Sequence, residues 1–163
     1  NGEGLPEITY TYPSMSYEGD VAQVLQQQWK ELGVTVNLQA LENEVYVAQR
    51  REKKDQLIRM QWYADYNDPT SWLMMYTSGN SINDIGYSNA EYDKLIFESD
   101  LETDPAKRQA ELLKAEKIAV SDDTVICPLF TNNQSLLYPP ELYNFYYDVI
   151  SYPNYTGMKV RTE

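Results

Sequence analysis

The sequence predicts an α/β fold with a mixed sheet flanked by helices, and three observations point to it. Three segments in the first half of the chain are rich in β-branched and aromatic residues, which is typical of strands. The two segments between them carry apolar residues at helical spacing. The resulting order of strand, helix, strand, helix, strand favours an α/β sheet with right-handed crossovers. The chain has 163 residues, of which 42% are hydrophobic, so it is long enough to bury a core.

These five elements follow one another along the first 64 residues. We expect strands at 7–12, 34–41 and 56–64, and helices at 19–33 and 43–54. Gly33 supplies a natural helix end, because glycine adopts the left-handed conformation without a steric cost. The second helix ends in basic residues, which suit the negative end of a helix dipole.

The second half of the chain reads as helical and then irregular. Pro69 is expected to open a short helix capped by Asp68, and Ser88 with Glu91 forms a capping-box pattern. A longer helix is expected at 104–123, where an aspartate again precedes a proline. We expect one or two strands in 124–138, and a loop-rich, tyrosine-rich region after them.

Composition excludes several classes of function. The net charge of −12 argues against nucleic acid as a partner, because phosphate binding needs clustered Lys and Arg. The sequence contains no histidine, which removes Ser-His-Asp catalysis and most transition-metal sites, and we expect no cofactor and no metal. The single cysteine, Cys127, excludes a disulfide framework and is expected to be a buried apolar residue. No apolar run approaches the length that spans a bilayer.

A cluster of charged and amide side chains in "IRMQWYADYNDPTSWL" is the main candidate site. As a glycosidase pair, Asp65 and Asp68 would have to face one bond at a set separation, and an N-cap role for Asp68 is the simpler explanation. A calcium site built on these residues and Asn67 lacks the usual loop glycine and distal glutamate. Arg59 and Asp65 are six residues apart and would share one face of a regular strand, where they could hold the two ends of a zwitterion. From the residues alone, a structural salt bridge is the favoured explanation for this pair.

Five motifs in one order carry a resemblance to a known family: "WKELGVTVNLQALE", "RMQWYADYNDPTSWL", "YSNAEYDKL", "RQAELLKAEKIAVSDDTVICPLF" and "LLYPPELYNF". They resemble the C-terminal part of the oligopeptide-binding proteins of ABC importers, which are the bacterial extracellular solute-binding proteins of family 5. The similarity runs from about Leu5 to Val160. It implies a periplasmic-binding-protein-like lobe and a binding function without catalysis.

The resemblance also implies a larger protein. Residues 1–163 would form a single C-terminal lobe of a two-lobed protein, with 150–163 a tail that returns to the missing N-terminal lobe. The opening "NGEGLPEITY" fits this expectation, because it reads like a linker that enters a strand. The implied partners are an oligopeptide ligand and the ABC permease subunits, and the implied location is extracytoplasmic, with a lipid anchor on the full-length protein.

Site residues follow from the resemblance one by one. Asp65 matches the family's aspartate that binds the peptide α-ammonium. Arg59 matches an arginine that can meet the peptide carboxylate, and Arg50 matches a second such arginine. Such peptides are bound in extended form through main-chain hydrogen bonds, so their charged ends need fixed partners.

Three further positions line the expected site. Trp62 matches a tryptophan of the side-chain pockets, and Glu42 matches a glutamate at the end of the second strand whose role stays open. Asn43 stands where close relatives carry a pocket tryptophan, so the shape of one pocket is expected to differ. Two rival hypotheses remain: a glycoside hydrolase that uses Asp65 and Asp68, and a signalling or adhesion module that reads peptides without import.

Overall fold

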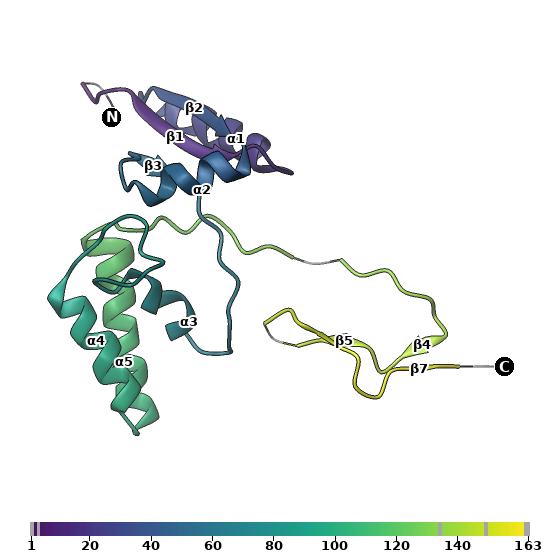
Figure 1. Ribbon diagram of the computed structural model, residues 1–163. Helices are drawn as coiled ribbons and strands as arrows, with labels where there is room; N and C mark the ends of the chain where they lie inside the picture. Colours follow the sequence, from purple (N-terminus) through teal and green to yellow (C-terminus); the bar gives the residue numbers. More distant parts are fainter. Residues whose placement is uncertain (1, 3, 134, 149, 162–163) are drawn as a thin grey trace. The chain divides into compact units, whose positions relative to one another are not determined.

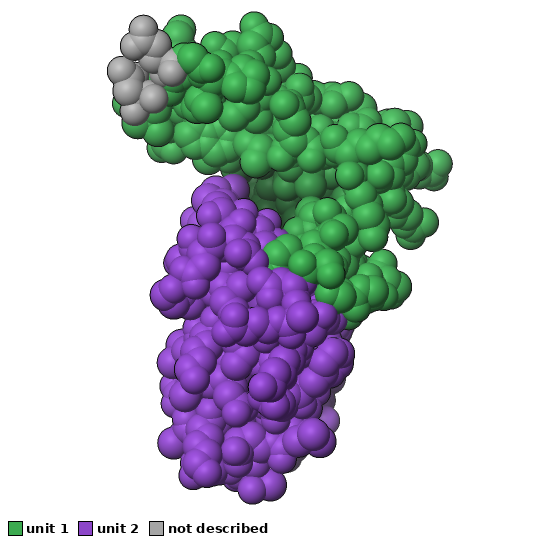
Figure 2. Space-filling model, turned by 90° about the vertical axis from the view of Figure 1, so that its left-hand side faces the viewer, with its two compact units in different colours: residues 1–62, 78–88 green, residues 63–77, 89–163 purple. Residues whose placement is uncertain are grey.

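The chain folds into two compact units, each described by itself (Figure 2). The computed structural model describes residues 2, 4–133, 135–148 and 150–161. The first unit comprises Asn1–Trp62 and Ser78–Ser88, and the second comprises Tyr63–Thr77 and Asn89–Glu163. Within the described residues, no helix combines the length and the apolar character that crossing a membrane requires.

The first unit is built on a parallel sheet of three strands (Figure 1). Strand β1 (Ile8–Pro13) is central, with β2 (Val36–Leu41) paired along its whole length on one side and β3 (Leu57–Ile58) on the other. Helices α1 (Glu18–Glu31) and α2 (Asn43–Arg51) connect the strands in sequence. The expected order of the five elements is therefore confirmed. Gly33 adopts φ 80°, in agreement with its predicted place after the first helix.

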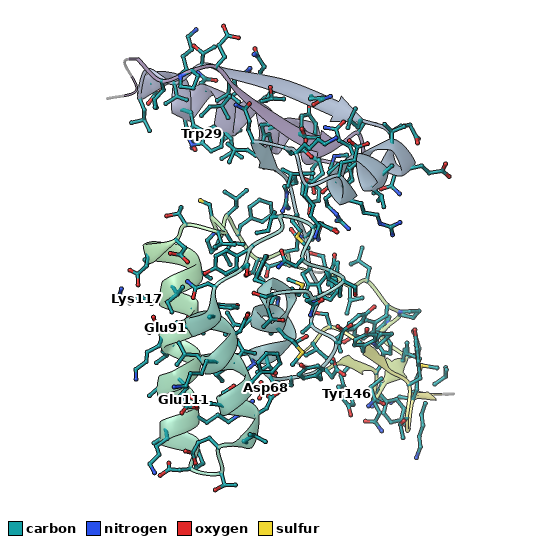
Figure 3. All side chains as sticks on the ribbon, turned by 60° about the vertical axis from the view of Figure 1, so that its left-hand side comes forward. Trp29, Asp68, Glu91, Glu111, Lys117 and Tyr146 are labelled. Atoms are coloured by element: carbon teal, nitrogen blue, oxygen red, sulfur yellow. The ribbon has the colours of Figure 1, made fainter. Side chains whose placement is uncertain are left out.

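Alternating side chains of β1 face the two sides of this sheet, as the period of two in a strand requires. Tyr10 and Tyr12 are buried with Ala22 of α1. Trp29 of α1, labelled in Figure 3, packs edge-on against the Tyr10 ring, with 6.2 Å between the ring centroids. Thr11, between the two tyrosines, is fully buried in a polar environment. Its hydroxyl donates to Asp55 at 2.7 Å, and Gln49 of α2 donates to the same carboxylate oxygen at 2.7 Å. The two tyrosines thus pack against α1, and the hydrogen bonds of Thr11 connect β1 to α2.

The third strand is much shorter than the sequence predicts. It was expected over 56–64, but the ladder ends at Ile58, followed by one further bond from the Arg59 N–H to the Thr11 oxygen at 2.8 Å. A strand persists only where a neighbour accepts and donates main-chain hydrogen bonds. Among the described residues, β1 offers only Tyr10 and Thr11 to β3.

The second unit is mainly helical. Helices α4 (Ala90–Leu101) and α5 (Pro105–Lys117) pack against each other, and α5 continues into a π-helical turn, η2 (Ile118–Asp122). A short helix α3 (Thr70–Leu73) runs into a 3-10 turn, η1 (Met74–Tyr76). The core of this unit contains Tyr92, Ile96, Leu112, Ala115 and Ala119.

Two helix starts in this unit test the predicted caps. Asp104 accepts hydrogen bonds from the amides of Ala106 and Lys107, so the cap of α5 is confirmed. The predicted capping box at Ser88 is wrong, because the neighbouring Asn89 accepts the amides of Glu91 and Tyr92. Asparagine is at least as good an N-cap as serine, and a pattern of single residues does not separate adjacent candidates.

The C-terminal segment departs from the expected strands. No residue of the described part of 124–138 belongs to a strand, and Cys127 is exposed rather than buried. The apolar run "TVICPLF" has the composition of a strand, but none of the described strands pairs with it. Beyond it, two antiparallel pairs form: β4 (Leu142–Tyr143) with β7 (Lys159–Val160), and β5 (Tyr146–Tyr147) with β6 (Pro153–Asn154).

Candidate functional site

The charged cluster identified in the sequence forms a turn that leads into α3. Asp65 lies at its start and is exposed, and its main-chain N–H donates to the Ser71 hydroxyl at 2.8 Å. Within the described part of the chain, its carboxylate makes no hydrogen bond and no ion pair. Asp65 thus presents a negative charge to solvent from a main chain that is held in place.

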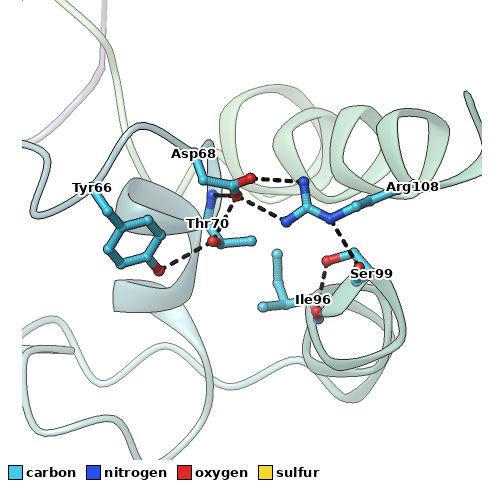
Figure 4. A network of polar contacts seen from close by, with 6 residues as sticks. All are labelled: Tyr66, Asp68, Thr70, Ile96, Ser99 and Arg108. Atoms are coloured by element: carbon cyan, nitrogen blue, oxygen red, sulfur yellow. Dashed lines mark hydrogen bonds and ion pairs between the residues drawn. The ribbon is translucent and has the colours of Figure 1, made fainter. Parts of the chain in front are cut away.

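Asp68, three residues later, has the opposite surroundings (Figure 4). Arg108 of α5 binds both of its carboxylate oxygens, with Nη1 at 2.8 Å from Oδ2 and Nη2 at 2.9 Å from Oδ1. Oδ1 also accepts the Thr70 amide at 3.0 Å and the Thr70 hydroxyl at 2.7 Å. Asp68 thus accepts the amide of Thr70, the first residue of α3, but Pro69 occupies the N-cap position, so the predicted helix start is one residue early. The sequence did not reveal the bidentate ion pair with Arg108.

The hydrogen bonds around Asp68 change the pKa values of Asp68 and Arg108. The Arg108 guanidinium, together with the two bonds from Thr70, lowers the pKa of Asp68 from 3.8 to about 2. The same contact raises the pKa of Arg108. Asp68 is therefore ionised at neutral pH and already bound on both oxygens, which leaves Asp65 as the available carboxylate of the turn.

A groove of about 740 Å³ lies beside the Asp68–Arg108 pair. Its walls come from the start of α3, the connection between α4 and α5, and α5 itself, with Trp72 and Leu113 as large exposed apolar residues. No group of three or more Asp, Glu, Cys or His residues that could hold a metal ion occurs within the described residues.

The predicted arginines lie in the first unit, and each contacts an acidic residue there. Arg59 pairs with Glu18 of α1 at 2.8 Å, and the two side chains are only 11% and 8% exposed. The Arg59 Nη1 donates to the Met60 carbonyl, and the Arg59 carbonyl accepts a hydrogen bond from the Tyr46 hydroxyl. Arg59 therefore does form a structural salt bridge, but the pairing with Asp65 that the residues favoured is not formed, because Glu18 is the partner.

Arg50, on the last turn of α2, is paired with Asp84 at 2.6 Å and lies over the Tyr46 ring, 5.7 Å from its centroid. Glu42 and Asn43 are exposed at the start of the same helix. Trp62 is half-buried, and its indole N–H is buried without a partner among the described residues.

The six predicted site residues are thus divided between the two units. The first unit carries Glu42, Asn43, Arg50, Arg59 and Trp62, and the second carries Asp65. The expectation that Arg59 and Asp65 share one face of a strand is not supported, because the ladder ends before both of them. Sequence reasoning missed Glu18, Asp84 and Arg108, which are 34 to 41 positions away from their partners in the chain. No local pattern signals a pair at such separations.

Comparison with known proteins identifies the family. The family model described as "Bacterial extracellular solute-binding proteins, family 5 Middle" matches residues 1–84, just over half of the 163 residues. The oligopeptide-binding protein OppA of Bacillus subtilis (strain 168) is 37% identical over 128 residues, which cover 77% of this chain and 23% of the relative.

Two solved structures agree with this assignment. An oligopeptide-binding protein (OppAIV) from Borrelia burgdorferi has a TM-score of 0.69 and 36% identity, covering 74% of this chain and 25% of that one. The substrate-binding domain of an oligopeptide ABC transporter from Bacillus anthracis has a TM-score of 0.79 and 25% identity, covering 96% of this chain and 31% of that one. The chain therefore spans about a quarter of the length of the curated relatives it matches, and it belongs to family 5 of the bacterial extracellular solute-binding proteins.

Proposed function

We propose that this chain is the peptide-ammonium-binding lobe of an oligopeptide-binding protein that serves an ABC importer. Members of the family are binding proteins that act in the periplasm or outside the cell membrane. The relatives named above bind oligopeptides or serve oligopeptide transporters. In the proposal, residues 1–163 form one lobe, a second lobe closes over the peptide, and permease subunits receive the complex. The full-length protein would be held at the membrane by a lipid anchor.

One observation carries the proposal: the contrast between the two aspartates of the turn. Asp68 is bound on both oxygens within the protein, whereas Asp65 directs an exposed carboxylate from a main chain fixed by Ser71. A peptide bound in extended form gains affinity from its main chain, and its charged amino end needs a fixed anion. Asp65 supplies that anion without requiring any particular side chain on the peptide.

The remaining predicted residues take supporting roles in the proposal. Arg50 and Arg59 would contribute positive charge toward the peptide carboxylate, although Asp84 and Glu18 already offset much of it. Trp62 would line a side-chain pocket with its half-buried indole ring. Glu42 and Asn43, exposed at the start of α2, would border the pocket that a tryptophan fills in close relatives.

The glycosidase alternative meets a physical difficulty at Asp68. A general acid at neutral pH needs a raised pKa, because it must hold a proton before it can donate one. The Arg108 contact lowers the pKa of Asp68 to about 2 instead. We therefore propose binding without catalysis as the function of this turn.

Calorimetry with paired ligands tests the proposal. Tripeptides with a free amino group and the same peptides after N-acetylation are titrated into wild-type protein, Asp65→Asn and a control, Asp20→Asn, which removes an exposed acid from the first turn of α1. Wild type and the control should prefer the free amine, and Asp65→Asn should lose about tenfold or more of that preference. Equal binding of both ligand forms by wild type would contradict the role given to Asp65.

A further inference from the structure

The turn that carries Asp65 is restrained by a network that begins in another part of the second unit. Asp68 lies at the centre of this network, and its own N–H donates to the Tyr66 carbonyl at 2.9 Å. The Tyr66 hydroxyl in turn contacts the Thr70 hydroxyl at 3.1 Å, and that hydroxyl donates to Asp68 (Figure 4). Tyr66, Asp68 and Thr70, which these hydrogen bonds connect, all lie within five positions of Asp65 in the sequence.

Arg108 connects this local set to the helical core. Its Nε donates to the Ser99 carbonyl at 3.0 Å, while its two terminal nitrogens bind Asp68. Ser99 is fully buried near the end of α4, and its hydroxyl donates to the Ile96 carbonyl at 2.7 Å. The planar guanidinium therefore fixes the turn to α4 and α5 at once, in a geometry that a lysine could not reproduce.

We propose that Arg108 is a positioning residue for peptide recognition, because its bidentate contact with Asp68 holds the turn that presents Asp65 to the ligand ammonium. The inference rests on the proposed function and extends it to a residue 43 positions along the chain. A charged contact loses strength when its partner is free to move, since ordering the group then costs free energy on binding. Arg108 supplies that order before the peptide arrives.

A double substitution at Asp68 and Arg108 can separate the positioning of the turn from the effect of the net charge on peptide binding. Arg108 and Asp68 carry opposite charges, so the double substitution Asp68→Asn/Arg108→Met removes the ion pair without changing the net charge. Asparagine keeps a carbonyl oxygen that can still cap the Thr70 amide. A loss of ammonium recognition in this variant would therefore come from the broken connection to α5.

The second unit offers a matched control pair. Lys117 and Asp122 form an ion pair at 2.5 Å at the end of α5, and both side chains are largely exposed. The variant Lys117→Met/Asp122→Asn removes the same two charges and leaves the turn untouched. Arg108→Lys is the conservative variant, which keeps the positive charge and loses the fork of two parallel hydrogen bonds.

The test measures the affinity ratio between a free-amine tripeptide and its N-acetylated form by calorimetry, for the protein that contains this chain and for each variant. We expect the ratio to fall roughly tenfold in Asp68→Asn/Arg108→Met, to fall less in Arg108→Lys, and to stay at the wild-type value in Lys117→Met/Asp122→Asn. A general loss of structure would weaken both ligands together and leave the ratio unchanged.

Two results would overturn the inference: a wild-type ratio in Asp68→Asn/Arg108→Met, or an equal fall in the control pair. If the double variant does not fold, as judged by its thermal transition, Arg108→Lys alone decides, and an unchanged ratio there would count against the positioning role. Failure of the proposed function has a different signature, because wild type itself would then show no preference for the free amine.

Discussion

At the scale of single residues, this chain uses similar acidic side chains in two ways. Asp68 and Glu18 are held by arginines and serve the structure, whereas Asp65 is left to solvent. The sequence places all three residues but does not reveal which of them is paired, because the arginine partners lie 40 and 41 positions away. The proline after Asp68 indicated a structural role for that residue, whereas the ligand-binding role of Asp65 was predicted through the family motif.

The Glu18–Arg59 pair leads to a prediction about stability. Arg59→Met should destabilise the first unit by about 3–5 kcal/mol, because Glu18 would remain buried with an uncompensated charge. The double variant Glu18→Gln/Arg59→Met should recover much of that loss, since it removes both charges. Urea denaturation of the two variants measures the difference, and equal stabilities would contradict the role assigned to this pair.

The exposed ion pair of Lys54 and Glu52 should contribute much less to stability than the buried Glu18–Arg59 pair. Lys54 and Glu52 are 3.2 Å apart, and their side chains are 79% and 60% exposed. Such pairs contribute little because water screens them, so Lys54→Met should change the free energy of unfolding by less than ~1 kcal/mol.

At the scale of elements, local patterns predicted the helices well and the strands less well. The helices of both units begin and end within a few residues of the expected positions, because periodicity and caps are encoded locally. The end of β3 and the irregular course of 124–138 depend on which neighbours are present to accept hydrogen bonds. Composition alone could not supply that information.

The cap of α4 gives a prediction at this scale. Asn89→Ala should cost about 1 kcal/mol of unfolding free energy, because the amides of Glu91 and Tyr92 would lose their acceptor. Ser88→Ala, at the position that the capping-box pattern favoured, should cost much less. Equal losses in thermal or urea denaturation would show that both residues contribute to the cap.

The contact between α5 and the turn before α3 should also be visible in the pH dependence of stability. Because the pKa of Asp68 is lowered from 3.8 to about 2, its ion pair contributes stability that is fully present above pH 4 and is lost as pH falls toward 2. The stability difference between wild type and Arg108→Met should therefore shrink between pH 4 and pH 2. A difference that stays constant down to pH 2, measured by denaturation, would contradict the assignment.

At the scale of the whole molecule, the chain corresponds to about a quarter of its curated relatives and divides into two compact units. The fold class and the family were predictable from motifs in a fixed order. The division into units was not, because it depends on contacts between segments far apart in the sequence. The predicted site residues are divided between the two units.

The second lobe of the proposed function predicts weak binding by residues 1–163 alone. A peptide enclosed between two lobes loses water on all sides, and a single lobe supplies only part of the contacts and of the water exclusion. We expect the isolated 163-residue chain to bind tripeptides with a dissociation constant above the micromolar range. Micromolar or tighter binding by the isolated chain in calorimetry would contradict this expectation.

An NMR titration of the isotope-labelled chain can show whether Asp65 binds the amino end of a peptide. The chain is titrated with a mixture of short peptides carrying free amino groups, and separately with the N-acetylated mixture, at millimolar concentration. We expect the amide signals of Asp65 and its neighbours to shift with the free amines only, because N-acetylation removes the charge that the carboxylate binds. Equal shifts with both mixtures, or no shift near Asp65 with either, would contradict it.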